Sequence, residues 1–160
     1  MFPALRPILN KGGAGRYISR AESVERLLPV AARHLDLLRA YDRELAALPE
    51  GPAREQIEAM MPYLRTEVSK MSETILSLGG TPPSGAGREP VGAPADETDR
   101  TRVQGFLDAE KDFARGLRQE ADEVHHQERT RAILGHNAAK ADDRLAMLRA
   151  VLAGLTPQIR

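Results

Sequence analysis

The sequence predicts an all-α protein: a four-helix bundle with one long crossover connection and a non-helical N-terminal arm. Two observations predict it. Four long segments carry apolar residues in alternating steps of four and three, which places these residues on one face of a helix. A stretch rich in Pro and Gly, residues 79–98, separates the second segment from the third. Four helices with one apolar stripe each bury those stripes most simply against one another, as a bundle.

The first helix is expected over residues 20–48. Ser19 and Glu22 have the spacing of a capping box, in which each side chain binds a backbone amide at the start of a helix. Pro49 ends the helix because proline disfavours helical backbone in the residue before it. Its apolar stripe comprises Leu27, Ala31, His34, Leu38, Tyr41, Leu45 and Leu48.

The second helix is expected over residues 52–78. Pro52 stands at its start, where proline is favoured because the missing amide hydrogen would have no partner there. Gly79 and Gly80 follow its end and supply the left-handed backbone that closes many helices. Its apolar stripe comprises Ile57, Met61, Leu64, Val68, Met71, Ile75 and Leu78.

The third and fourth helices are expected over residues 99–125 and 130–155. The stripe of the third helix comprises Val103, Leu107, Glu110, Ala114, Leu117, Ala121 and Val124. The stripe of the fourth comprises Leu134, Ala138, Ala141, Leu145, Leu148, Leu152 and Leu155. Glu110 is the one charged residue in these two stripes, which makes it a candidate for a buried site.

The turn between the third and fourth helices is expected around residues 125–130. Continuing the stripe of the third helix would bring Glu128 and Arg131 into the core, where unpaired charges are costly. A turn at residues 135–137 remains an alternative, since Gly135 suits a helix end and Asn137 suits a helix start.

Residues 79–98 are much longer than a hairpin between two neighbouring helices needs. A helix of about 27 residues is ~40 Å long. An extended chain covers ~3.3 Å per residue, so this stretch could reach from one end of the bundle to the other. Such a connection makes the second and third helices run parallel.

Composition limits the classes of function. Lys and Arg together number 23, as do Asp and Glu, so no overall charge favours nucleic acid or an anionic membrane as a partner. The chain has no Cys, which excludes disulfides and thiolate catalysis. It also has no apolar run long enough to cross a membrane, and a cytoplasmic location is expected. Its 160 residues suit a single domain, expected at 19–156, preceded by an arm at 1–18.

Two motifs resemble the bacterioferritins of the ferritin-like superfamily. Residues 75–83, "ILSLGGTPP", resemble the end of their second helix, and residues 108–119, "DAEKDFARGLRQ", resemble their third helix around a metal-binding glutamate. With the helix layout, the resemblance covers roughly residues 24–155. It implies ferritin-like topology and, for the family, two irons held by Glu and by Glu-x-x-His pairs inside the bundle.

The ligand positions of that family are only partly kept in this sequence. Glu110 matches the glutamate of the third helix, and His34 stands where the first helix of the family has a glutamate. In the second helix Leu64 replaces the glutamate and Glu67 replaces the histidine. The fourth helix offers Asn137 or Ala138 and Lys140 or Ala141. The resemblance therefore implies a degenerate di-iron site.

Two interpretations of these residues stay open. His34, Glu67 and Glu110 could form a mononuclear site for iron, manganese or zinc, with Tyr41 beside it. Alternatively, His34 and Glu110 form a structural ion pair across two helices, Glu67 is solvated, and no metal is bound. No catalytic residue is predicted, and the expected cofactor is none or one transition metal ion.

The favoured function is that of a non-catalytic homo-oligomer, a dimer or larger, or of a partner-binding protein. The apolar and basic arm, residues 1–18, is the expected contact with a protein partner. The alternative is a redox or oxidant-protective metalloprotein, and an enzyme of this kind would be a metal-dependent oxidoreductase. Two further hypotheses stay open. Residues 123–128, "EVHHQE", could bind a metal ion at the surface or could simply form a polar turn. Residues 154–160 could be a loading tail for encapsulin shells.

Overall fold

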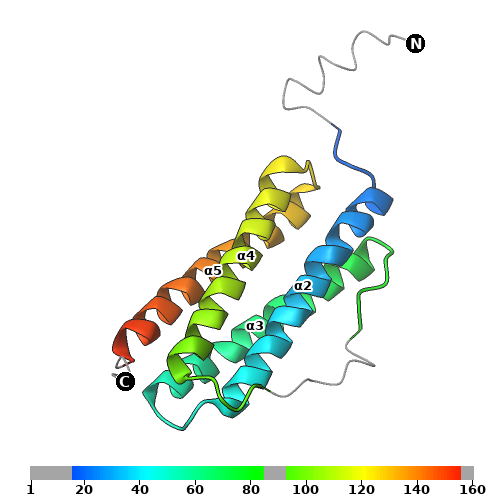
Figure 1. Ribbon diagram of the computed structural model, residues 1–160. Coiled ribbons are helices and arrows are strands. Elements are labelled where there is room, and N and C mark those ends of the chain that lie inside the picture. The colour runs from blue at the N-terminus through cyan, green and yellow to red at the C-terminus, as the bar shows by residue number, and fades with distance from the viewer. Residues whose placement is uncertain (1–15, 85–92, 156–160) are drawn as a thin grey trace, which may run out of the picture.

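The computed structural model describes residues 16–84 and 93–155, and these residues form four α-helices and no strand. The helices are α2 (Arg20–Ala47), α3 (Pro52–Ser77), α4 (Asp99–Glu123) and α5 (Glu128–Gly154). They pack against one another along their lengths (Figure 1). The predicted all-α four-helix bundle is therefore confirmed.

Local chemistry explains where the helices begin and end. The Ser19 hydroxyl oxygen accepts a hydrogen bond from the Glu22 amide at 3.1 Å, as the capping spacing predicted. At the end of α3, Gly79 has a φ of 87°, a left-handed conformation that favours glycine. Glycine is required at position 80 for a different reason: a Cβ atom there would lie 2.5 Å from the side chain of Val24. The two glycines thus end α3 and let it approach the start of α2.

The turn between α4 and α5 occupies residues 124–127. The alternative turn at residues 135–137 is wrong, because these residues lie inside α5. A glycine within a helix costs about 1 kcal/mol relative to alanine. Burial of Leu134 and Ala138 on either side of Gly135–Asn137 outweighs that cost.

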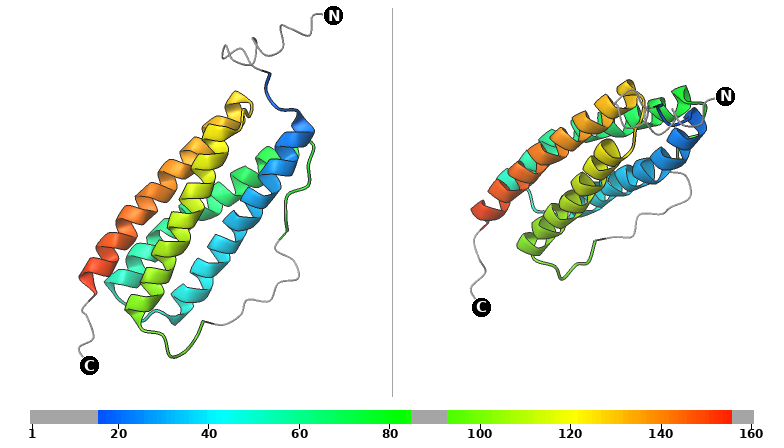
Figure 2. Two further views of the ribbon diagram at one scale, coloured as in Figure 1. Left: turned by 45° about the horizontal axis from the view of Figure 1, so that its top comes forward. Right: turned by 90° about the horizontal axis from the view of Figure 1, so that it is seen from above.

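Each helix packs against two neighbours. α2 lies between α3 and α4, and α5 packs against the same two helices on the other side of the bundle. Figures 1 and 2 show α2 and α5 running in one direction and α3 and α4 in the other. Two contacts agree with these directions. Gly80, which follows the end of α3, lies beside Val24 near the start of α2. Arg102, near the start of α4, binds Glu44 near the end of α2.

The core is mainly aliphatic and follows the predicted stripes with three shifts. Leu37 rather than Leu38 is buried in α2, Glu67 rather than Val68 in α3, and Val151 rather than Leu152 in α5. The expectation that Glu67 is solvated is therefore wrong.

None of the helices in the described part of the chain is long and apolar enough to span a membrane.

Candidate functional site

A buried arginine lies at the centre of the bundle. The Arg144 guanidinium of α5 donates from Nη1 to Glu67 Oε2 of α3 at 2.7 Å, and from Nε to Glu110 Oε1 of α4. The side chains of all three residues are at most 5% exposed. One cation thus joins two carboxylates that come from different helices.

Tyr41 adds the remaining helix, α2, to this centre. Its hydroxyl donates to Glu110 Oε1 at 2.7 Å, and its ring stacks on Phe106 with the ring centroids 4.5 Å apart. Burial and the nearby Glu110 carboxylate raise the pKa of Tyr41 far above its usual range. The hydroxyl therefore keeps its proton and acts as a hydrogen-bond donor. We call Tyr41, Glu67, Glu110 and Arg144 the arginine centre.

Burial also shifts the carboxylates of the arginine centre. It raises the pKa of Glu67 to about 7, although the Arg144 charge and hydrogen bond act in the opposite direction. It raises the pKa of Glu110 as well, again against Arg144 and the Tyr41 hydrogen bond. Two carboxylates and one guanidinium carry one excess negative charge, which a single shared proton neutralises. The arginine centre is therefore suited to hold one proton near neutral pH.

His34 lies in the core of α2 and is fully buried. Neither of its ring nitrogens has a hydrogen-bond partner among the described residues, and its ring packs on Phe113 with centroids 4.6 Å apart. Burial and the positive charge of Arg144 lower the pKa of His34 to about 3, so the imidazole is neutral. The expected ion pair between His34 and Glu110 is wrong. Glu110 is bound instead by Arg144 and Tyr41.

The three residues predicted as metal ligands do not form a metal site within the described part of the chain. No group of three or more His, Cys, Asp or Glu side chains there is arranged to hold a metal ion. Glu67 Oε1 and Glu110 Oε2 do lack hydrogen-bond partners. However, Arg144 stands between these two carboxylates, and a guanidinium next to a metal cation would repel it. The donor set therefore fits a metal ion only if Arg144 moves away.

Sequence reasoning missed Arg144. It flanks the predicted stripe of the fourth helix, next to Leu145, and arginine is rarely buried unless it is paired. The one signal in the sequence was indirect. Glu110 lies within an apolar stripe and needs a positive partner, and Arg144 lies beside the stripe of another helix.

A second polar network joins α2 to the turn between α4 and α5. His126 is fully buried, with Nδ1 3.3 Å from Ser23 Oγ and Nε2 2.7 Å from Glu120 Oε1. Arg26 donates to both oxygens of Glu120, at 2.8 and 3.1 Å. Burial acts to raise the pKa of Glu120, but the hydrogen bonds from Arg26 and His126 outweigh it and lower that pKa.

This second network has a structural role. It contains a serine, a histidine and a glutamate, but Ser23 is fully buried and no substrate can reach its hydroxyl. Next to it, the Ile18 amide donates to the His125 carbonyl at 3.0 Å, and the rings of Tyr17 and His125 stack. The network therefore fixes residues 17–18 to the turn. His126 is buried within this turn, which does not suit a surface metal ligand.

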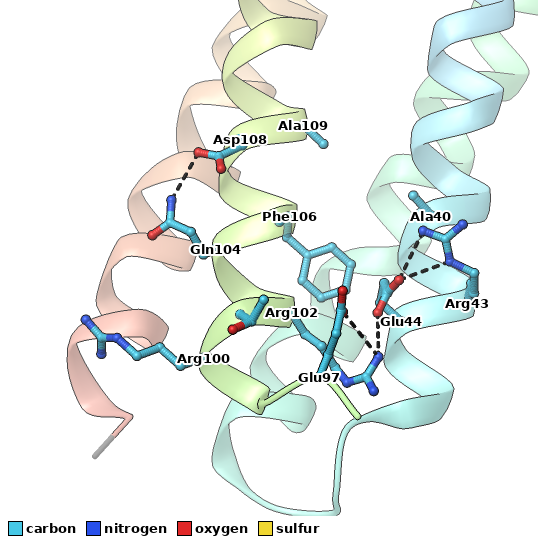
Figure 3. A pocket seen from close by; sticks show the side chains of 12 residues that line it. Ala40, Arg43, Glu44, Glu97, Arg100, Arg102, Gln104, Phe106, Asp108 and Ala109 are labelled. Carbon is cyan, nitrogen blue, oxygen red and sulfur yellow. Dashed lines mark hydrogen bonds and ion pairs between the residues drawn. The ribbon is translucent and has the colours of Figure 1, made fainter. Parts of the chain in front are cut away.

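A hollow of about 590 Å³ lies at the opposite end of the bundle (Figure 3). Two of its cations are paired with one carboxylate: Arg102 Nη1 donates to Glu44 Oε2 at 2.8 Å, and Arg43 Nε donates to Glu44 Oε1 at 3.0 Å. Arg102 also donates to the Pro94 carbonyl and lies 3.8 Å from Glu97. These bonds hold the residues before α4 against α2, so the hollow is explained by packing.

No protein-family model matches the sequence, and none of the curated proteins matches it. The resemblance to the ferritin-like superfamily therefore stays a prediction.

Proposed function

We propose that the protein is a ferritin-like bundle without a competent di-iron centre, and that it acts without catalysis as a homo-oligomer or a partner-binding protein. The observation that carries this proposal is the Arg144 guanidinium bound to both Glu67 and Glu110. The resemblance to bacterioferritins places Glu110 and Glu67 at positions where that family has metal ligands. In this protein the positive charge beside them is that of Arg144, in place of a metal ion.

The helix arrangement supports the ferritin-like part of the proposal. α3 and α4 run in the same direction, and α2 packs antiparallel against both (Figure 2). The segment 79–84 leaves the bundle at the end where α2 begins and runs down its side, and residues 93–98 lie at the opposite end (Figure 1). In the proposed topology, residues 79–98 are the single long crossover of a ferritin-like bundle.

The chemistry of the arginine centre supports the non-catalytic part. Oxidation at a di-iron site needs carboxylates that clamp two cations about 4 Å apart. A guanidinium has no redox chemistry and no open coordination position. Leu64, at a position that the resemblance gives to a glutamate, is fully buried and has no donor atom. The remaining groups stabilise one another instead of binding an oxidisable metal.

The alternative function is a redox or oxidant-protective metalloprotein with one iron, manganese or zinc ion at His34, Glu67 and Glu110. One observation favours it: both nitrogens of His34 and one oxygen of each glutamate have no hydrogen-bond partner among the described residues. Neutral imidazole and carboxylate are suitable ligands for these metals. This function requires Arg144 to leave the two carboxylates.

Aerobic oxidation of iron(II) distinguishes the two functions. We expect the wild-type chain to oxidise iron(II) no faster than buffer alone, because Arg144 occupies the carboxylates. A matched protein with Glu110→Ala serves as the control. Oxidation above the buffer rate that disappears in the Glu110→Ala variant would contradict the proposal and support the metalloprotein.

A further inference from the structure

A second hollow, of about 320 Å³, lies between α3 and α5 on the outside of the bundle. Lys70, Thr74 and Ser77 line it from α3, at a spacing that puts all three on one face of the helix. Arg129 and Asn137 line it from α5, two helical turns apart. The volume is at the lower end of the range for small-ligand sites, about 300–1,000 Å³.

Asn137 is a buried polar group in the wall of this hollow. Its side chain is 1% exposed, and its Nδ2 atom has no hydrogen-bond partner among the described residues. A buried amide without a partner is costly, so such groups are nearly always satisfied by the protein, by water or by a ligand. Asn137 therefore points to a polar species bound at this place.

The charges around the hollow are not neutralised. Lys70 and Arg129 are exposed, and neither side chain forms an ion pair with a described residue. Glu73 is the only carboxylate among the described residues that line the hollow. Lys70, Arg129 and Glu73, the Lys, Arg, Asp and Glu residues of the lining, leave one net positive charge. This differs from the hollow at the end of the bundle, where Glu44 already binds two guanidinium groups.

The hydroxyl groups of the lining are already used as donors. Thr74 Oγ1 donates to the Lys70 carbonyl at 2.8 Å, and Ser77 Oγ donates to the Thr74 carbonyl at 2.7 Å. The side chains left to donate to a ligand are therefore Lys70, Arg129, the His136 ring and the Asn137 amide. An ammonium, a guanidinium and an amide are the donors that bind carboxylate and phosphate oxygens.

We propose that the hollow between α3 and α5 binds a small oxyanion, the carboxylate or phosphate group of a small molecule. Lys70 and Arg129 supply the attractive charge at its rim, and Asn137 donates a hydrogen bond from its wall. One net positive charge suits a group that carries about one negative charge. The site is separate from the arginine centre and does not depend on the function proposed above.

Calorimetric titration of the full chain tests this site. The probes are inorganic phosphate and acetate, added in separate titrations at an ionic strength held constant with sodium chloride. We expect saturable binding of one or both, and the preferred probe identifies the ligand as a phosphate or a carboxylate. Lys70→Gln and Arg129→Gln should each weaken binding by roughly tenfold, since each removes a charge-assisted bond.

Two further variants make the test specific. Arg131→Gln removes an exposed charge from the same helix outside the hollow and should leave binding unchanged. Asn137→Leu removes an amide nitrogen that bonds to no described residue, so the fold should persist while binding weakens. Absence of saturable binding for both probes would overturn the proposal, as would equal weakening by Arg131→Gln and Arg129→Gln.

Discussion

Arg144 brings one positive charge to two carboxylates in a layer that water does not reach. Its planar guanidinium can donate along two directions at once, which a lysine ammonium does less well. Such a buried group is stable only as a set, because removal of one member leaves an uncompensated charge in a medium of low polarity. The energetic value of Arg144 therefore depends on Glu67 and Glu110.

We expect Arg144→Met to lower the free energy of unfolding by about 3–5 kcal/mol, the usual cost of breaking a buried ion pair. Adding Glu67→Gln and Glu110→Gln to the same chain should restore most of this loss, because no unpaired charge remains. Urea denaturation of the single and triple variants measures both effects. Arg131→Met, at an exposed position, is the control. A single variant as stable as wild type would show that Arg144 does not balance the carboxylates.

The titrations of Glu67 and His34 make the free energy of unfolding depend on pH in opposite directions. The pKa of Glu67 is raised from 4.5 to about 7, so its contribution is complete below pH 4.5 and is lost as pH rises through about 7. The pKa of His34 is lowered from 6.5 to about 3, so its contribution is present above pH 6.5 and is lost as pH falls towards 3.

Replacement of Glu67 separates the two effects. We expect wild type to lose stability relative to Glu67→Gln as pH rises from about 5 to about 8, since only wild type releases this proton on the way. Urea denaturation of both proteins at the two pH values gives the difference. A difference that is independent of pH, or that changes with the opposite sign, would show that the Glu67 pKa is not raised.

The helices as elements could be predicted from the sequence because each one repeats its apolar residues at helical spacing. The caps at Ser19 and Gly79 carry their own local chemistry. Side-chain partners could not be predicted in the same way. Arg144 was missed because its burial depends on Glu67 and Glu110, residues that are far apart in the sequence and meet only in the folded bundle. The orphan nitrogens of His34 likewise follow from tertiary packing.

Two glycine substitutions test the helix boundaries. Gly135 lies inside α5, and a Cβ atom there meets nothing within 4 Å. Gly135→Ala should therefore stabilise the protein by roughly 0.5–1 kcal/mol. Gly79 has a φ of 87°, so Gly79→Ala should destabilise by about 1 kcal/mol. Thermal unfolding measures both, and destabilisation by Gly135→Ala would favour a turn at that residue.

At the scale of the whole molecule, the four helices bury their apolar stripes against one another. Residues 17–18 are fixed to the turn between α4 and α5 by the Ile18–His125 hydrogen bond and the Tyr17–His125 stack. Residues 1–15, which make up most of the predicted arm, lie outside the described residues, as do residues 156–160 of the predicted tail. The predicted arm is apolar and basic in sequence, and residues 17–18 hold its end against the bundle. Such a segment is suited to contact another protein chain.

We expect deletion of residues 1–16 to lower the native mass of the protein, because the proposed oligomer contact is lost while the bundle stays intact. Light scattering coupled to size-exclusion chromatography measures the mass. The truncated chain should keep the helical content of its four helices. An unchanged oligomer after deletion would place the contact on the bundle itself.

The central claim is that Arg144 takes the place of a metal between Glu67 and Glu110. Elemental analysis of the full chain tests it most directly, after purification without chelators or a polyhistidine tag and after exposure to iron(II), manganese(II) and zinc(II). We predict no stoichiometric metal in the wild type. Near-stoichiometric metal that is lost in both His34→Ala and Glu110→Ala would contradict the claim and establish a buried metal site.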